Sequence, residues 1–138
     1  MLTIDTPAPE RPKRTAAIAG ALALTGALAW LAITLGTVAY QARVVAMHNR
    51  RLQGMLAAKP LEAQVVAGLE AEGTMPRDVA RTSDEREALA RRATPQRAHV
   101  LAPGATVAVT RAFVSGEMLY LVHFDATGTM VGFTLAGG

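Results

Sequence analysis

Cysteine is absent from this 138-residue sequence, and aromatic residues make up only 4% of it. Without cysteine the chain can form no disulfide, no thiolate metal site and no cysteine nucleophile. Nucleic-acid bases would find few aromatic side chains on which to stack, and the net charge is only +3. We therefore expect neither a disulfide-stabilised scaffold nor a protein that binds nucleic acid.

Sequence motifs for catalysis are also missing. The histidines His48, His99 and His123 lie far apart, with no spacing typical of a metal site. The acids within 84–87 fit the first turn of a helix, and Ser115 lacks the G-x-S-x-G context of a nucleophile. Glycine pairs occur only at the C-terminus, so no phosphate-binding loop is visible. We predict that the protein is not an enzyme and that it has no catalytic residue, no cofactor and no metal.

Charged residues are missing from a third region, the 28 positions between Arg14 and Arg43. As a helix, residues 16–40 would reach roughly 37 Å, which exceeds the roughly 30 Å of a bilayer core. A cleaved export signal is the alternative, but the run is longer than the roughly 7–15 residues of a signal core. A buried core helix would show a polar face. We therefore predict a permanent transmembrane helix over 15–42.

The charges beside this span predict its orientation. Arg11, Lys13 and Arg14 precede it, whereas only Arg43 follows closely, which favours a cytoplasmic N-terminus by the positive-inside rule. Residues 1–14 are predicted to be a disordered cytoplasmic tail, and the C-terminus to be periplasmic, as in a signal anchor. Twelve arginines against two lysines, with abundant alanine, indicate a GC-rich bacterial genome. The predicted location is therefore the bacterial inner membrane.

A helical juxtamembrane region is predicted over 43–95. Its three helices are expected at about 43–58, 60–72 and 83–93. Pro60 suits the first position of a helix, and Thr82 with Glu85 forms a capping box before the third helix. The stretch 74–82, TMPRDVART, is predicted to be a connector.

The pattern changes to strands in the last part of the chain, over 100–136. Three β-rich runs are separated by turn residues at 115–116 and 125–128. Both faces of the middle run are apolar, so one of the helices or a partner protein must cover one face of the meander. The predicted fold class is therefore a membrane protein with a single transmembrane helix. A small α+β extramembrane domain follows the helix and ends in a three-stranded antiparallel β-meander.

Small residues form rows at four-residue spacing along the span. Such rows let helix backbones approach closely inside lipid, although an alanine-rich genome would also produce them. The predicted transmembrane interface consists of Gly20, Ala23, Ala27 and Trp30.

Two further groups of predicted contact residues contain most of the basic residues near the span and around the third helix. The first group is expected to touch lipid headgroups or an acidic partner, and it consists of Arg43, Arg50, Arg51 and Lys59. A second group is expected to dock the domain on a partner, unless its arginines are simply solvated. This group consists of Arg91, Arg92, Arg97, Tyr120 and Phe124.

These features together look like those of small accessory subunits of bacterial inner-membrane complexes. Pilin-like proteins also place a long N-terminal helix before a sheet, but the acid that their pattern requires inside the span is absent. We predict a non-catalytic accessory or assembly subunit, whose partners are the lipid bilayer and a larger integral membrane complex. The alternative is a membrane-tethered extracytoplasmic module that binds a ligand or peptide on the apolar face around Tyr120, Val122 and Phe124.

Overall fold

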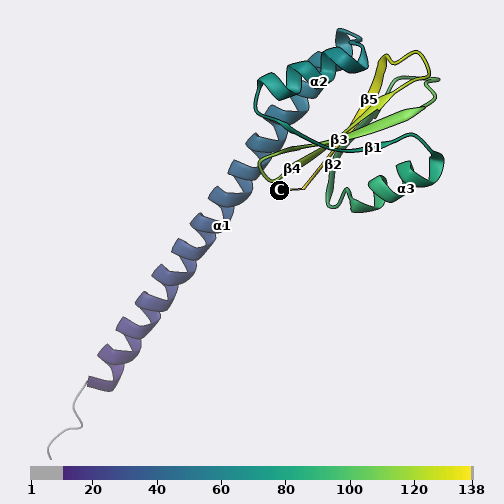
Figure 1. Ribbon diagram of the computed structural model, residues 1–138. Coiled ribbons are helices and arrows are strands. Elements are labelled where there is room, and N and C mark those ends of the chain that lie inside the picture. The colour runs from purple at the N-terminus through teal and green to yellow at the C-terminus, as the bar shows by residue number, and fades with distance from the viewer. Residues whose placement is uncertain (1–10, 138) are drawn as a thin grey trace, which may run out of the picture. The chain divides into compact units, whose positions relative to one another are not determined.

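The computed structural model describes residues 11–137, with side chains described from residue 15 onward (Figure 1). The chain divides after Tyr40 into an N-terminal helical unit and a C-terminal domain. Helix α1 (Arg11–Ala57) contributes to both of them. Residues 1–10 of the predicted tail lie outside the described residues, whereas residues 11–14 form the first turn of α1.

Helix α1 continues well beyond the predicted span. The helix predicted over 43–58 is the C-terminal part of this same 47-residue element. Pro12 is tolerated because it lies in the first turn, where its missing N–H has no helical acceptor in any case. The helix ends before Lys59, which adopts a positive φ of 47°, and Pro60 follows.

The C-terminal domain is built on a five-stranded antiparallel sheet with the strand order β1-β3-β4-β5-β2. One short helix precedes these strands in the sequence, and a second lies between the first two strands. The elements are α2 (Glu62–Ala71), β1 (Met75–Ala80), α3 (Ser83–Arg92), β2 (Gln96–Leu101), β3 (Val109–Ser115), β4 (Met118–Phe124) and β5 (Met130–Gly137). The predicted meander is present as β3, β4 and β5 at the centre of this sheet.

Two edge strands correct the prediction of a three-stranded sheet. Strand β1 occupies the stretch that was predicted to be a connector, and β2 begins before the predicted β region. Five of the six residues of β1 are exposed, so its sequence lacks the apolar alternation of a half-buried strand. Both strands take their hydrogen bonds from distant segments, β1 from β3 and β2 from β5, and such pairing leaves no local signal.

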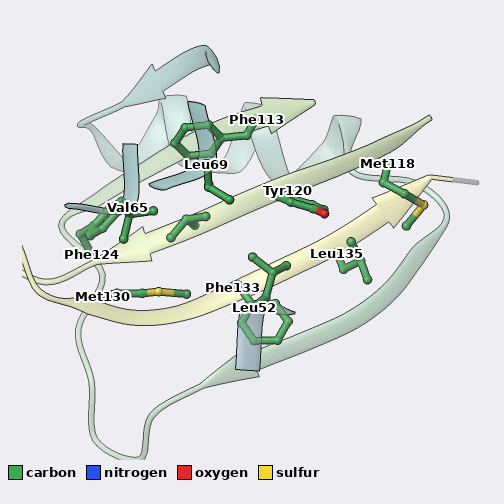
Figure 2. Close-up of a cluster of buried hydrophobic side chains, with 11 residues drawn as sticks. Leu52, Val65, Leu69, Phe113, Met118, Tyr120, Phe124, Met130, Phe133 and Leu135 are labelled. Carbon is green, nitrogen blue, oxygen red and sulfur yellow. The ribbon is translucent and has the colours of Figure 1, made fainter. Parts of the chain in front are cut away.

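One face of the sheet packs against the end of α1 and against α2. Figure 2 shows this core, in which Leu52 of α1 and Val65 and Leu69 of α2 meet large side chains of the central strands. Phe113, Tyr120, Phe124, Phe133 and Leu135 are all fully buried there. The apolar cover that the sequence required on this face is therefore supplied by the domain's own helices.

Helix α3 covers the opposite face of the sheet (Figure 1). Leu89 and Ala93 pack there against Leu121 and several alanines of the strands. Thr82 caps the helix by accepting a hydrogen bond from the backbone N–H of Glu85, with 3.2 Å between nitrogen and oxygen. The sheet therefore lies between two helical layers, one with large side chains and one with small ones.

Candidate functional site

The N-terminal part of α1 is an uncovered apolar helix. Its sequence is long and apolar enough to cross a membrane, and within the most apolar window none of it is buried in the structure. Leu22, Trp30 and Ile33 are each between 68% and 69% exposed. The hydroxyl groups of Thr25 and Thr34 donate to carbonyl oxygens four residues earlier, at 2.8 Å. The helix therefore satisfies these polar groups internally while it exposes apolar side chains.

The predicted transmembrane interface lies on one face of this helix. Gly20, Ala23, Ala27 and Trp30 are separated by three, four and three residues, a spacing that places them along a single stripe. All four residues are exposed. A Cβ atom at Gly20 would meet nothing within 4 Å. This stripe is flat at its N-terminal end and carries one large aromatic ring.

The predicted headgroup residues divide into two kinds. Arg43, Arg50 and Lys59 are exposed. Arg51 instead turns into the domain, where it forms an ion pair with Glu72 and donates a 3.2 Å hydrogen bond to the hydroxyl of Thr74. Its guanidinium group also lies 5.7 Å from the centre of the Tyr120 ring. Arg51 therefore holds the end of α1 on the sheet.

Tyr120 and Phe124, which were predicted to dock on a partner, are instead fully buried under α1 and α2 (Figure 2). The Tyr120 hydroxyl contacts Nδ1 of His48, which is also buried. Neither predicted residue is available at the surface, which corrects their docking role. The same cover removes the apolar face on which the predicted binding module depended. The sequence showed that this face needed a cover but not which segment supplies it.

The three arginines of the docking group remain at the surface. Arg92 forms a 3.1 Å ion pair with Asp78, and both side chains are at least 60% exposed. Exposed pairs of this kind contribute about 0.2–1 kcal/mol to stability. Arg97 donates from Nε to the carbonyl oxygen of Gly137 at 2.9 Å. The docking role of Arg91, Arg92 and Arg97 stays a prediction.

A cavity of about 360 Å³ lies between α3 and the sheet, and we call it the histidine pocket. Its lining includes both apolar and polar side chains, namely Arg86, His99, Val107, Thr110, Leu121, His123 and Thr134. No sequence pattern indicates this site, because His99 and His123 are 24 positions apart. Strand pairing places β2 and β4 on either side of β5, so the two rings meet with their centres 5.9 Å apart.

Four polar side chains form a continuous chain of hydrogen bonds across the sheet at this pocket. The hydroxyl of Thr110 lies 2.8 Å from Nδ1 of His123, and Nε2 of His123 lies 3.0 Å from the hydroxyl of Thr134. The Thr134 hydroxyl also lies 2.7 Å from Nδ1 of His99. Thr110, His123 and Thr134 are buried, whereas His99 is exposed at the end of the chain.

The environment of His123 keeps its imidazole neutral. Burial, followed by the nearby positive charges of His99 and Arg86, lowers the pKa of His123 from 6.5 to about 4. A neutral imidazole has one N–H donor and one acceptor nitrogen. At neutral pH, His123 therefore donates to one of the two threonines and accepts from the other.

The histidine pocket does not have the ligand set of a metal site. Among residues 11–137, no group of three or more His, Cys, Asp or Glu side chains is placed to hold a metal ion. Both nitrogens of His123 are already engaged by threonine hydroxyls. A larger cavity of about 610 Å³ beside α2 contains charged groups as well, but Glu62 and Arg111 in its wall form an ion pair with each other.

No protein-family model matches the chain, no curated protein matches its sequence, and no solved structure matches its fold.

Proposed function

We propose that this protein is a single-pass membrane protein of the bacterial inner membrane, anchored by residues 15–42. The exposed apolar surface of α1 between residues 15 and 40 supports this proposal most directly. A helix that is apolar on all sides is stable only when lipid or protein surrounds it. Lipid would surround this segment on every side that a partner helix leaves open.

The proposed orientation has a cytoplasmic N-terminus and a periplasmic domain, and the cysteine-free sequence makes it easy to test. Glu117 is exposed in the turn between β3 and β4, so Glu117→Cys gives the chain a single reactive thiol. We expect a membrane-impermeant maleimide to label this thiol in spheroplasts before lysis. Labelling only after lysis would place the domain in the cytoplasm.

The proposed role is that of a non-catalytic accessory or assembly subunit of a larger membrane complex. In lipid, helices associate through close backbone packing, and the stripe of Gly20, Ala23, Ala27 and Trp30 offers a surface for such packing. Gly20 leaves open space for a partner helix, and the Trp30 ring is 68% exposed. The three exposed arginines of the docking group would contact the partner outside the membrane.

Exposed basic side chains that follow the span support a second proposed contact, with lipid headgroups or with an acidic surface of the partner. Arg43, Arg50 and Lys59 are free of the ion pair that holds Arg51 in the domain. Each such charge contributes about 1 kcal/mol when it lies near an anionic lipid surface. We propose that these three residues contact lipid headgroups or an acidic surface of the partner.

Enlarging the stripe tests the proposed association. The triple variant Gly20→Leu, Ala23→Leu and Ala27→Leu fills the space that a partner helix would occupy. We expect a C-terminally tagged chain, extracted in a mild detergent, to recover a stoichiometric membrane partner that mass spectrometry identifies. The variant is expected to recover at least about tenfold less of it, which corresponds to about 1.4 kcal/mol of lost association energy.

A matched triple variant on the opposite side of the helix serves as the control. Ala29→Leu, Ala32→Leu and Gly36→Leu also change two alanines and one glycine, and at about 100° per residue they face away from the stripe. This control is expected to retain the partner. Equal recovery with both variants, or no partner with the unmodified chain, would refute the proposed use of the stripe.

A further inference from the structure

The positions of the protons in the histidine pocket follow from the hydrogen bond of Thr110, the buried residue at one end of the chain of hydrogen bonds. Thr110 is only 2% exposed, and Nδ1 of His123 is its only side-chain hydrogen-bond partner among the described residues. A buried hydroxyl that donates to nothing costs about 1–3 kcal/mol. The Thr110 O–H therefore donates to Nδ1 of His123, and this nitrogen is the acceptor of the neutral ring.

The acceptor role of Nδ1 of His123 determines which group donates in each of the remaining hydrogen bonds, as far as the exposed His99. Because Nδ1 of His123 accepts, its Nε2–H donates to the hydroxyl of Thr134. The Thr134 O–H is then free to donate to Nδ1 of His99. The neutral form of His99 accordingly carries its proton on Nε2, for which no hydrogen-bond partner exists among the described residues. Thr110 therefore sets the tautomer of His99, a residue of the pocket lining, so that the Nε2–H of His99 remains as a donor for a ligand.

Arg86 adds further donors to the same pocket. Its Nη1 atom donates to the carbonyl oxygens of Ala108 and Arg81, at 2.8 and 3.2 Å, and these bonds fix the guanidinium group. The N–H groups on Nε and Nη2 have no partner among the described residues. A cavity that presents a fixed imidazole donor and a fixed guanidinium group favours an acceptor with negative charge.

The other residues that line the pocket restrict the charge and the polarity of the ligand. Glu87 is the one acid among the described residues that line the pocket, and its charge opposes a second negative charge on a ligand. Ser83 and Gln96 can donate or accept, whereas Leu101, Val107 and Leu121 form an apolar wall. A cavity of about 360 Å³ is within the size range of small-molecule sites.

We propose that the histidine pocket binds a short aliphatic monocarboxylate, whose carboxylate accepts hydrogen bonds from His99 and Arg86 while its carbon chain contacts the apolar wall. Thr110 acts as a positioning residue, because it sets the tautomer of His99 through His123 and Thr134. This binding does not depend on the proposed association of the span, so either proposal can fail without the other.

Butyrate is a suitable probe, and its neutral isostere butyramide is the matched control ligand. The full chain, labelled with ¹⁵N-histidine in lipid nanodiscs, would be titrated with each compound at constant ionic strength. We expect butyrate to shift the imidazole resonances of His99 saturably, with a dissociation constant on the order of 1 mM, as befits a ligand with few atoms. His48 lies on the other face of the sheet, so its resonances should not move.

Two variants separate the roles of the residues. Arg86→Gln should weaken butyrate binding by roughly tenfold, the effect of one charge-assisted contact. Arg91→Gln, on the same helix but outside this pocket, should leave it unchanged. Thr110→Val keeps the side-chain shape but removes the donor, so the ¹⁵N shifts of His99 should move toward those of a mixture of tautomers.

Several results would overturn the proposal. Absence of a saturable shift with butyrate would exclude the carboxylate site, and equal binding of butyramide would show that the pocket does not recognise charge. An unchanged His99 tautomer in a folded Thr110→Val protein would refute the positioning role of Thr110. If Arg86→Gln fails to fold, the comparison of butyrate with butyramide on the unmodified chain still decides the case.

Discussion

Leu52→Ala is expected to lower the free energy of unfolding of the C-terminal domain by about 3 kcal/mol. Leu52 is completely buried, and it is the α1 residue that belongs to the buried core cluster itself, whereas Val45, Met55 and Leu56 pack against that cluster only partly buried (Figure 2). The substitution removes apolar contacts with the sheet and leaves a cavity that the surrounding side chains fill only in part. Urea unfolding of the full chain in detergent micelles, followed by pulse proteolysis, would measure the change.

The same substitution at Leu28 provides the control for Leu52→Ala. Leu28 lies on the same helix but is 58% exposed in the uncovered segment. Leu28→Ala should therefore leave the stability of the domain unchanged. If the two variants unfold at the same urea concentration, the end of α1 is not part of the core.

Acidification is expected to destabilise the domain through His123. Its pKa is about 4 in the folded state and 6.5 in an unfolded chain, so between these values only the unfolded state binds the proton. The neutral histidine therefore contributes its full stability above pH 6.5, and this contribution is lost as the pH falls toward 4. The pKa difference corresponds to roughly 3 kcal/mol.

His123→Gln isolates this effect from the titration of carboxylates. The variant keeps a hydrogen-bonding side chain but cannot bind the proton. Between pH 7 and pH 4, the unmodified protein should lose roughly 3 kcal/mol more unfolding free energy than the variant. Urea unfolding at the two pH values would measure both losses, and equal losses would mean that His123 does not titrate in this way.

Local patterns in the sequence were sufficient to predict the helices and the central strands. The uncharged run before Arg43 predicts a long helix, and Thr82 with Glu85 predicts the start of α3. The alternation of apolar residues predicts β3, β4 and β5. Local patterns do not predict strands β1 and β2, because the residues of these strands are mostly exposed and their partner strands are distant in the sequence.

The candidate sites were less predictable than the fold, because they depend on pairing between distant segments. His99 meets His123 only when β2 pairs with β5, a pairing that also requires Gly132. A Cβ atom at Gly132 would clash with the carbonyl oxygen of Val100 on β2. The sequence likewise predicts Arg51 to be part of a basic surface, whereas the fold places Glu72, at the end of α2, beside it.

The strand order has a consequence for the way the domain folds. Both edge strands precede the meander in the sequence, and among the described strands β2 pairs with β5, which follows the other four along the chain. Pairing β1 with β3 and β2 with β5 closes long loops of chain, which is entropically costly. These pairings therefore form more slowly than the local helices α2 and α3. The histidine pocket cannot exist before β5 arrives. Strand β1 can pair once β3 has been made, whereas β2 stays unpaired until β5 follows, and during this interval chaperones or assembly partners have access to β2.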